Sequence, residues 1–366
     1  MGLNHSPKII TDGLLFAYDI GNTEKSGKGA PTENLITISG SDAGILRSGV
    51  GYSYYGQNIS SAVQSRWSAG NNQLVLSFEG RRDYSIGGTG SGNDGYPQAY
   101  VYFSDWSWAV AVGVTTYSWS RGSVAFTMPD PTGKAVMFDI YHMNAGNPGL
   151  SYSRNHQVEF STYATPFVNG TRTNTQAVLD LTGVSTITAI NMAYASNGTI
   201  TFNGSTSGMT VSTSLFNRVN GSQMTVACWI KPSRLSGVYQ MLVDNRSDNQ
   251  YNWMLYQHTN DGSIQLHGLN QNKSTYIPTV GTWIYVVNTV DPAGNSILYI
   301  NGVVQQTVTG FTYNLSSPSL LCIGRFGASG YEPYQGSIET VQLYDRVLSQ
   351  DEIQRNFNAL RGRYGI

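Results

Sequence analysis

Residues 281–307 read GTWIYVVNTVDPAGNSILYINGVVQQT, and this stretch decides the fold. Residues 282–290 are a β-branched and aromatic run, which favours a pleated, half-buried strand. The sequence Asp-Pro-Ala-Gly-Asn at 291–295 is turn chemistry, because Pro presets φ and Gly accepts a positive φ. Asn301-Gly302 lies between two apolar runs and predicts a type I′ hairpin, since that turn needs a positive φ at both central residues. The stretch therefore predicts three antiparallel strands in succession.

The segments that follow occur in a characteristic order. A Leu-Leu-Cys-Ile-Gly run covers residues 320–324, and a long strand is expected over 335–344. Leu348-Ser349 with Glu352 forms a capping box, which predicts a helix over 350–361. The order resembles the laminin-G-like, concanavalin A-like lectin/glucanase sandwich, whose pattern is a Gly-x-Trp strand, a Tyr-x-Asn-Gly hairpin, an Ile-Gly strand, a Gly-x-Ile strand and a short helix. The resemblance implies a fold but no particular activity, because one fold hosts many functions.

The first strand of the chain is expected over residues 9–19, with a break at Asp12-Gly13. In the resembled family this strand lies in the same sandwich as the last one, here 338–344. The resemblance therefore implies a discontinuous concanavalin A-like domain made of residues 1–33 and 173–366. Bacteriophage virion proteins with this fold open with a similar Asp-Gly-Leu-x-x-x-Tyr-Asp stretch and close like residues 356–366, so the chain resembles them at both ends.

The intervening residues 34–172 are expected to form a second β-sandwich or jelly roll. Strand-like runs separated by turn clusters recur through this module, and they cover residues 73–79, 98–104, 123–128, 135–142 and 156–160. Its end resembles the exit of carbohydrate-binding-module-like jelly rolls in phage tail proteins. The predicted fold class is therefore all-β, with two sandwich modules, one inserted in the other, and a short C-terminal helix.

Composition narrows the classes of function. Charged residues make up 12% of the 366 residues and the net charge is −1, so no basic stripe supports nucleic-acid binding. The hydrophobic share of 40% is ample for buried cores. No run reaches the roughly 18 apolar residues of a membrane span, and the first residues lack the pattern of a signal peptide. Cys228 and Cys322 lie on expected strands and are interpreted as buried thiols.

The sequence lacks recognisable catalytic patterns. The glucanase branch of the resembled superfamily uses a Glu-x-Asp-x-(x)-Glu strand, whose alternate carboxylates face one side. Here the nearest carboxylate pairs are Glu79 with Asp83 and Asp351 with Glu352, and neither has that spacing and setting. The 5 histidines show no zinc-ligand spacing, and there is no nucleophile elbow. We therefore predict that the protein is not an enzyme.

Aromatic rings beside Asn, Gln or Asp are the side chains expected to bind sugar. The carbohydrate-binding candidates are Tyr100, Tyr102, Trp106, Trp108, Tyr331 and Tyr334. Tyr100 and Tyr102 alternate and would share one face of a strand, as would Trp106 and Trp108. Core or inter-subunit packing is the alternative explanation for each ring.

The polar loop at 244–249 is the candidate metal site. Laminin-G-like domains often hold calcium at a rim with an Asp and backbone carbonyls, so the resemblance implies Asp244 and Asp248 as ligands. A plain turn is the simpler explanation, because the EF-hand spacing is missing. No other cofactor is expected.

These observations predict a non-enzymatic bacteriophage virion structural protein, as a tail, fibre, neck or capsid-decorating component. Its expected role is adhesion to host-surface glycan or stabilisation of the particle. The expected partners are other virion proteins, further copies of the chain in a homo-oligomer and host-surface glycan. The expected location is the surface of the phage particle, after assembly in the host cytoplasm. Two alternatives stay open: a polysaccharide-degrading glycoside hydrolase-like enzyme, and a soluble lectin.

Overall fold

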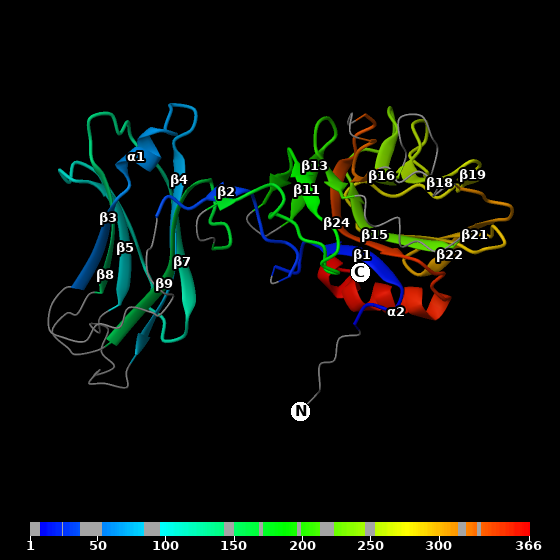
Figure 1. Cartoon of the computed structure of the whole chain (residues 1–366), viewed down its shortest axis with the longest axis horizontal. Helices are drawn as coiled ribbons and strands as arrows, with labels where there is room; N and C mark the ends of the chain where they lie inside the picture. The colour runs from blue at the N-terminus through cyan, green and yellow to red at the C-terminus, as the bar shows by residue number, and fades with distance from the viewer. Residues whose placement is uncertain are drawn as a thin grey trace. The chain divides into compact units, whose positions relative to one another are not determined.

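The chain divides into two compact units. Unit 1 combines Met1–Ala30 with Asn174–Ile366, and unit 2 is Pro31–Thr173. The computed structural model describes residues 8–23, 25–36, 53–83, 96–142, 150–167, 171–195, 199–212, 223–245, 253–313, 320–327 and 331–366. Within them, regular structure is mainly antiparallel strand (Figure 1). The predicted all-β class, built from sandwich-like units with a short C-terminal helix, is confirmed.

The first sheet of unit 1 has the strand order β12-β13-β24-β15-β20-β21-β22, with β1 also paired to β24. Its strands are β1 (Leu14–Asp19), β12 (Ala193–Tyr194), β13 (Ile200–Asn203), β15 (Met224–Pro232), β20 (Ile284–Val290), β21 (Ser296–Ile300), β22 (Val303–Val308) and β24 (Gln335–Tyr344). The expected type I′ geometry is present, since Asn301 has a φ of 52° and Gly302 a φ of 81°.

The first and last strands of the chain pair in this sheet. β1 pairs with β24 in an antiparallel register that runs from Leu14 opposite Tyr344 to Asp19 opposite Thr340. Phe16 and Tyr18 of β1 are completely buried. The expectation that the first strand lies beside the last strand is confirmed, and a single sheet therefore contains both strands.

The second sheet of unit 1 has the order β11-β14-β23-β16-β17-β18-β19. Its strands are β11 (Ile187–Ile190), β14 (Gly208–Val211), β16 (Gln240–Asp244), β17 (Met254–Gln257), β18 (Ile264–His267), β19 (Gln271–Lys273) and β23 (Leu321–Ile323). Val226, Cys228 and Ile230 of β15 belong to the core that also holds residues of this second sheet. Both Cys228 and Cys322 are buried.

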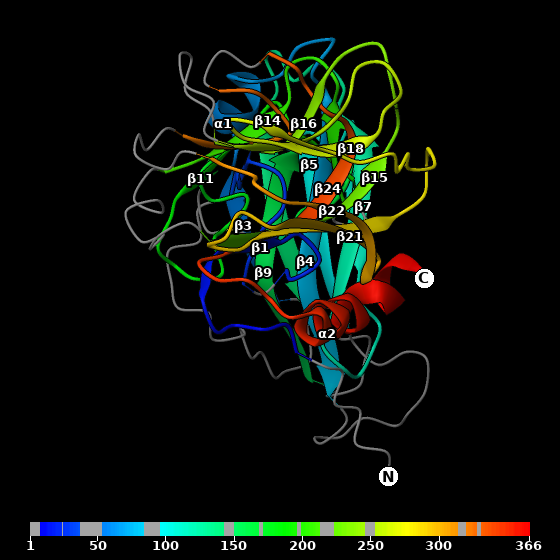
Figure 2. The ribbon, with the colours of Figure 1, turned by 90° about the vertical axis from the view of Figure 1, so that its right-hand side faces the viewer.

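The other face of the first sheet packs against the C-terminal helix α2 (Gln350–Leu360) and the 3₁₀ turn η2 (Arg361–Tyr364). Figure 2 shows the two sheets and α2 as three successive layers. Trp229 of β15 stacks against Phe357 of α2 and Tyr364 of η2, with ring centroids 5.7 and 4.2 Å away. The side chains of β15 therefore alternate between the inter-sheet core and the helix.

Unit 2 is a smaller sandwich of two antiparallel sheets, β3-β8-β5-β6 and β7-β4-β9. Its elements are β2 (Thr32–Glu33), β3 (Ser53–Asn58), α1 (Ser60–Gln64), β4 (Gln73–Asp83), β5 (Pro97–Phe103), β6 (Ala109–Gly113), β7 (Ser120–Thr127), β8 (Val136–His142), β9 (Leu150–Phe160) and β10 (Thr171–Arg172). Leu76, Phe78, Val101 and Phe138 are fully buried in its core. The five-residue helix α1 was not expected from the sequence, because it is too short to show a helical period.

No helix in the described residues is long and apolar enough to cross a membrane.

Candidate functional site

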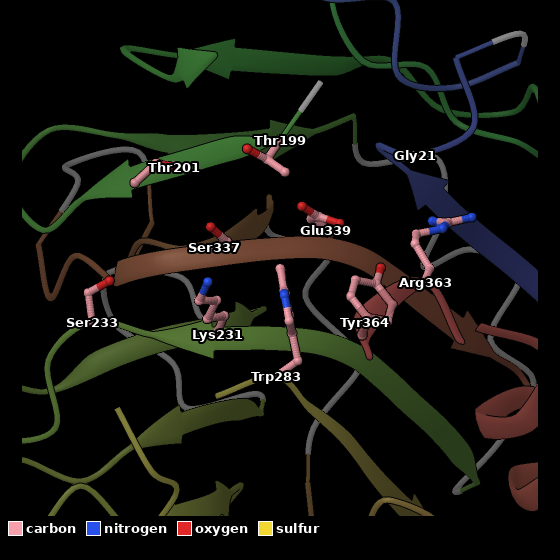
Figure 3. Close-up of a pocket in the computed structure, with 10 residues that line it drawn as sticks. All are labelled: Gly21, Thr199, Thr201, Lys231, Ser233, Trp283, Ser337, Glu339, Arg363 and Tyr364. Atoms are coloured by element: carbon pink, nitrogen blue, oxygen red, sulfur yellow. The ribbon is translucent and has the colours of Figure 1, made fainter. Parts of the chain in front are cut away.

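A groove of about 710 Å³ lies on the α2 side of the first sheet of unit 1 (Figure 3). It is lined by Gly21, Thr199, Thr201, Lys231, Ser233, Trp283, Ser337, Glu339, Arg363 and Tyr364. The lining comes from residues in or next to β1, β13, β15, β20 and β24, and from η2. Segments far apart in the sequence therefore build one site.

Strand alternation places these side chains on the groove side. Ile200 of β13, Ile230 of β15 and Ile338 of β24 belong to the inter-sheet core. Their neighbours along the strands, such as Lys231 and Ser337, therefore face the opposite side of the sheet. The strand positions that face the groove can therefore be polar, because the alternate positions supply the apolar side chains of the core.

A β-bulge presents Glu339 to the groove. Trp229 pairs with Thr340 while Ile230 pairs with Ile338, so Glu339 is an extra residue on β24. A bulge leaves its additional residue out of the ladder and redirects a side chain. The bulge also lets Ile338 and Val341, three residues apart, both enter the inter-sheet core.

Glu339 is only 5% exposed. Burial raises its pKa, and the nearby Asp19 carboxylate acts in the same direction, while Arg363 and Lys231 act in the opposite direction. Arg363 is itself paired with Asp19 through two contacts, of which Nη2 to Oδ2 is 3.1 Å. Glu339 is therefore a weakly acidic group beside the Asp19–Arg363 ion pair, whose two charges compensate each other.

Trp283 forms the aromatic wall of the groove. Its ring is half-buried, with its centroid 4.6 Å from that of Tyr364 and 5.9 Å from Lys231 Nζ. Tyr364 is stacked in turn on Trp229. The indole is thus supported from one side, with hydroxyl groups of Thr199, Ser233 and Ser337 elsewhere around the same groove (Figure 3).

A second group of aromatic and polar side chains lies on the outer face of the β3-β8-β5-β6 sheet of unit 2. The Tyr102 hydroxyl donates to Asp139 Oδ2 at 2.5 Å, and the Tyr141 hydroxyl donates to the same oxygen at 3.3 Å. The Tyr100 ring packs edge-on against Tyr141, and Trp106 stacks on Tyr102 with ring centroids 4.2 Å apart. The expectation that Tyr100 and Tyr102 share a face holds in this register.

Comparison with protein families gives one match, to the family described as the concanavalin A-like lectin/glucanases superfamily, over residues 202–354. Residues 202–354 form a domain of this superfamily. Residues 202–354 include β15, β20 and β24, and so contribute Lys231, Trp283 and Glu339 to the groove. The sequence matches no curated protein.

Several solved structures resemble the chain. One is domain 4 of AbnA, a GH43 extracellular arabinanase from Geobacillus stearothermophilus in complex with arabinotriose, with 22% identity, 49% of this chain and 91% of that chain covered, and a TM-score of 0.40. Another is the binding domain of botulinum neurotoxin DC in complex with rat synaptotagmin II, with 12% identity, 51% and 50% covered, and a TM-score of 0.40. The receptor binding domain of botulinum neurotoxin C/D mosaic serotype has 16% identity, 50% and 48% covered, and a TM-score of 0.41. The chain spans about half the length of these neurotoxin chains.

The remaining predicted carbohydrate-binding residues have different surroundings. Trp108 does not share a face with Trp106, because residues 104–108 form a turn in which Trp106 has a φ of 56°. Trp108 instead packs on Phe103 and Phe126 at the core of unit 2. In unit 1 Tyr331 is 67% exposed, whereas Tyr334 is completely buried against Phe202 and cannot present its ring to a ligand.

The proposed calcium ligands are only partly described. Asp244 is completely buried at the end of β16, and its Oδ2 accepts a hydrogen bond from the Gly327 amide at 3.4 Å. Asp248 lies outside the described residues. Among the residues that are described, no group of three or more His, Cys, Asp or Glu side chains could hold a metal ion.

The residues of the groove were not predicted as a site. In the sequence, Trp283 belongs to the Gly-x-Trp strand pattern and Glu339 to the last expected strand, and neither pattern indicates a binding site. A polar residue within a β-branched strand is a signal that could have drawn attention to Lys231 and Glu339. No local sequence pattern indicates the bulge at Glu339, or the position of Arg363 and Tyr364 beside it.

Proposed function

We propose that this protein binds glycan without cleaving it, and that unit 1 holds the sugar in the groove beside Trp283. The observation that supports the proposal is a supported indole ring next to several hydroxyls and a buried carboxyl in one groove. Sugar rings stack their apolar faces on aromatic side chains, and a few placed polar groups fix their hydroxyls. The superfamily assignment of residues 202–354 is compatible with this role.

The state of the two carboxyls at this site supports binding without cleavage. Retaining glycosidases need a carboxylate nucleophile and an acid about 5–5.5 Å apart. Asp19 is engaged by both terminal nitrogens of Arg363. A carboxylate held in this way is poorly suited to attack a sugar carbon, and Asp19 is the carboxylate that the described contacts place near Glu339.

Hydrolysis is the second candidate function, and one observation favours it. A raised carboxyl pKa, as at Glu339, is the property that a general acid needs near neutral pH. Incubation with bacterial capsule and cell-wall polysaccharide tests this candidate. New reducing ends that disappear in Glu339→Gln would replace the binding proposal with an enzymatic one.

The biological setting that we propose is the surface of a bacteriophage particle. The support comes from the sequence at the two ends, which resembles virion proteins of this fold. The chain would then act in adhesion to host glycan or in particle stabilisation, with other virion proteins and further copies of itself as partners. Labelling of purified particles with an antibody against this chain, viewed by electron microscopy, would test the setting; unlabelled particles would refute it.

Replacement of the groove indole tests the binding proposal directly. We expect the full chain to bind a subset of glycans on an array, and Trp283→Ala to weaken binding to the strongest of them on the order of tenfold, or about 1.4 kcal/mol. Titration calorimetry gives the affinity. Tyr239→Ala is the matched control in unit 1, because Tyr239 is an exposed ring that packs on Tyr256 outside the groove.

Two results would count against this assignment. One is a folded chain that binds no glycan on the array. The other is an affinity that Trp283→Ala leaves unchanged while its thermal unfolding midpoint stays within a degree or so of the parent.

A further inference from the structure

Trp106 in unit 2 is exposed and has a strained backbone. Its side chain is 56% exposed, and its φ is 56°. A bulky residue in the left-handed region is a genuine outlier, and such strain persists only where the surroundings hold it. Here the Trp106 amide donates to the Phe103 carbonyl at 2.8 Å, and the indole lies nearly parallel to the Tyr102 ring, at an interplanar angle of 18°.

The Tyr102 ring, on which Trp106 stacks, is held in place by its own contacts. Tyr102 is nearly buried and donates its hydroxyl to Asp139, which is 3% exposed. Gly56, opposite Asp139 in the register, leaves the space for that carboxylate, because a Cβ there would lie 2.1 Å from Asp139 Oδ1. The indole is therefore a preorganised platform, with one face on Tyr102 and more than half of its surface in solvent.

The neighbouring strand β6 carries small side chains on the same face of the sheet. Tyr102 pairs with Ala109 and Tyr100 with Ala111, and directly opposed residues share a face. Both alanines are exposed, while Val110 and Val112 pack against the core of unit 2. A row of aromatic rings thus stands beside a strip of small side chains, which leaves room for a flat molecule against the rings.

The polar groups of this face fit an uncharged sugar. The Tyr100 hydroxyl donates to Gln98 Oε1 at 2.7 Å, and the Tyr141 hydroxyl lies at Asp139. At the edge of the face, Asp105 is neutralised by Lys134. Among the described side chains of this face, the hydroxyls of Tyr102 and Tyr141 contact the Asp139 carboxylate, and no cation does, so its negative charge disfavours anionic ligands.

We propose that the outer face of the β3-β8-β5-β6 sheet is a second glycan-binding site, in which Trp106 stacks on a neutral pyranose ring. The hydroxyls and amide around Tyr100, Gln98 and Tyr141 contact the sugar hydroxyls. This site acts independently of the groove in unit 1. It gives unit 2 a binding role of its own and makes the chain bivalent, which raises avidity for a polymer that carries repeated sugars.

Affinity electrophoresis of the full chain through gels containing a soluble neutral polysaccharide tests the site. The probes are hydroxyethylcellulose, xyloglucan, galactomannan and dextran, with polygalacturonate as the acidic comparison. All variants carry Trp283→Ala, so that binding through the unit 1 groove does not contribute. We expect retardation by at least one neutral polymer, and a loss on the order of tenfold in affinity with Trp106→Ala.

Two further variants separate binding from folding. Trp106→Gly should lose binding to the same extent while its thermal midpoint stays equal to or above that of the parent, because Gly adopts a positive φ without strain. Trp119→Ala should retain binding, since Trp119 is an exposed ring outside this face, beneath Arg154.

Three outcomes would overturn the proposal. They are no retardation by any neutral polymer, retardation that survives both Trp106 variants, and retardation by polygalacturonate alone. Loss of self-association in Trp106→Ala without any loss of polysaccharide binding would likewise assign the indole to a protein contact instead.

Discussion

Glu339 combines two unfavourable features for a carboxyl group, deep burial and a nearby carboxylate. The pKa of Glu339 is raised first by burial and then by Asp19, with Arg363 and Lys231 opposing the shift. The folded state therefore binds the Glu339 proton more tightly than the unfolded state does. The contribution to stability is fully present below the unfolded pKa of about 4.3, and it is lost as pH rises through the folded pKa.

Glu339→Gln should remove this pH-dependent loss while keeping the shape of the side chain. We expect the difference in free energy of unfolding, Glu339→Gln minus parent, to increase as pH rises from 4 to 8, because only the parent must ionise a buried group. Urea unfolding of the full chain at several pH values measures it, with Asp351→Asn at an exposed helical position as control. A difference that is flat with pH, or that decreases, would contradict the raised pKa.

At the scale of elements, α2 is defined by its first turn. The Ser349 hydroxyl accepts from the Glu352 amide at 3.3 Å, and Glu352 Oε2 accepts from the Ser349 amide at 2.9 Å. Glu352 also receives two hydrogen bonds from Arg346, which lower its pKa to about 2. α2 buries Ile353 and Phe357 against the first sheet. The cap therefore determines the residue at which the helix begins to cover that sheet.

Ser349→Ala should lower the free energy of unfolding of unit 1 by about 1 kcal/mol, since the Glu352 amide at the helix start loses the hydroxyl that accepts its hydrogen bond. Denaturant unfolding followed by near-UV circular dichroism reports the change through the Trp229 stack. Asn358→Ala, on the exposed side of the same helix, serves as the comparison and should be close to neutral. Equal effects of the two substitutions would mean that the capping box contributes nothing measurable.

At the scale of the whole molecule, the chain enters and leaves unit 2 at adjacent points. Thr32 and Glu33 pair with Arg172 and Thr171. Within unit 1, Gly27 forms a bridge with Val178, and the Lys28 amide donates to the Ala177 carbonyl at 2.8 Å. Closely spaced ends are the arrangement in which a domain insertion is tolerated, so we propose that unit 2 is an inserted module.

Deletion of residues 31–173, with a short Gly-Ser linker joining Ala30 to Asn174, should leave a folded unit 1. The expected product is monodisperse, unfolds cooperatively and retains the glycan binding that depends on Trp283, because its sheets and core lie outside the deleted segment. Deletion of residues 1–21 is the contrasting variant and should fail to fold, since it removes the buried Phe16 and Tyr18. An unfolded product of the first deletion would contradict independent folding of unit 1.

Features that depend on near neighbours in the chain were predictable. The Asn301-Gly302 turn and the Ser349–Glu352 cap follow from steric and hydrogen-bonding preferences over a few residues. Trp106 and Trp108 show the limit of such reasoning. Their spacing suggests one shared face, but the turn at 104–108 rotates one ring into solvent and the other into the core.

The sequence by itself therefore determined the all-β class, the turns and the helix start, since these are set by local backbone preferences. The tertiary structure alone decided which polar strand positions became a groove. Helix α2 is 11 residues long, or roughly 16 Å, and covers Tyr344 on β24 but not Ser337. The bulge then presents Glu339 at the uncovered part, next to a chain end more than three hundred residues from Asp19. Which part of the first sheet α2 covers depends on where segments far apart in the sequence end in space, and no local sequence pattern encodes those positions.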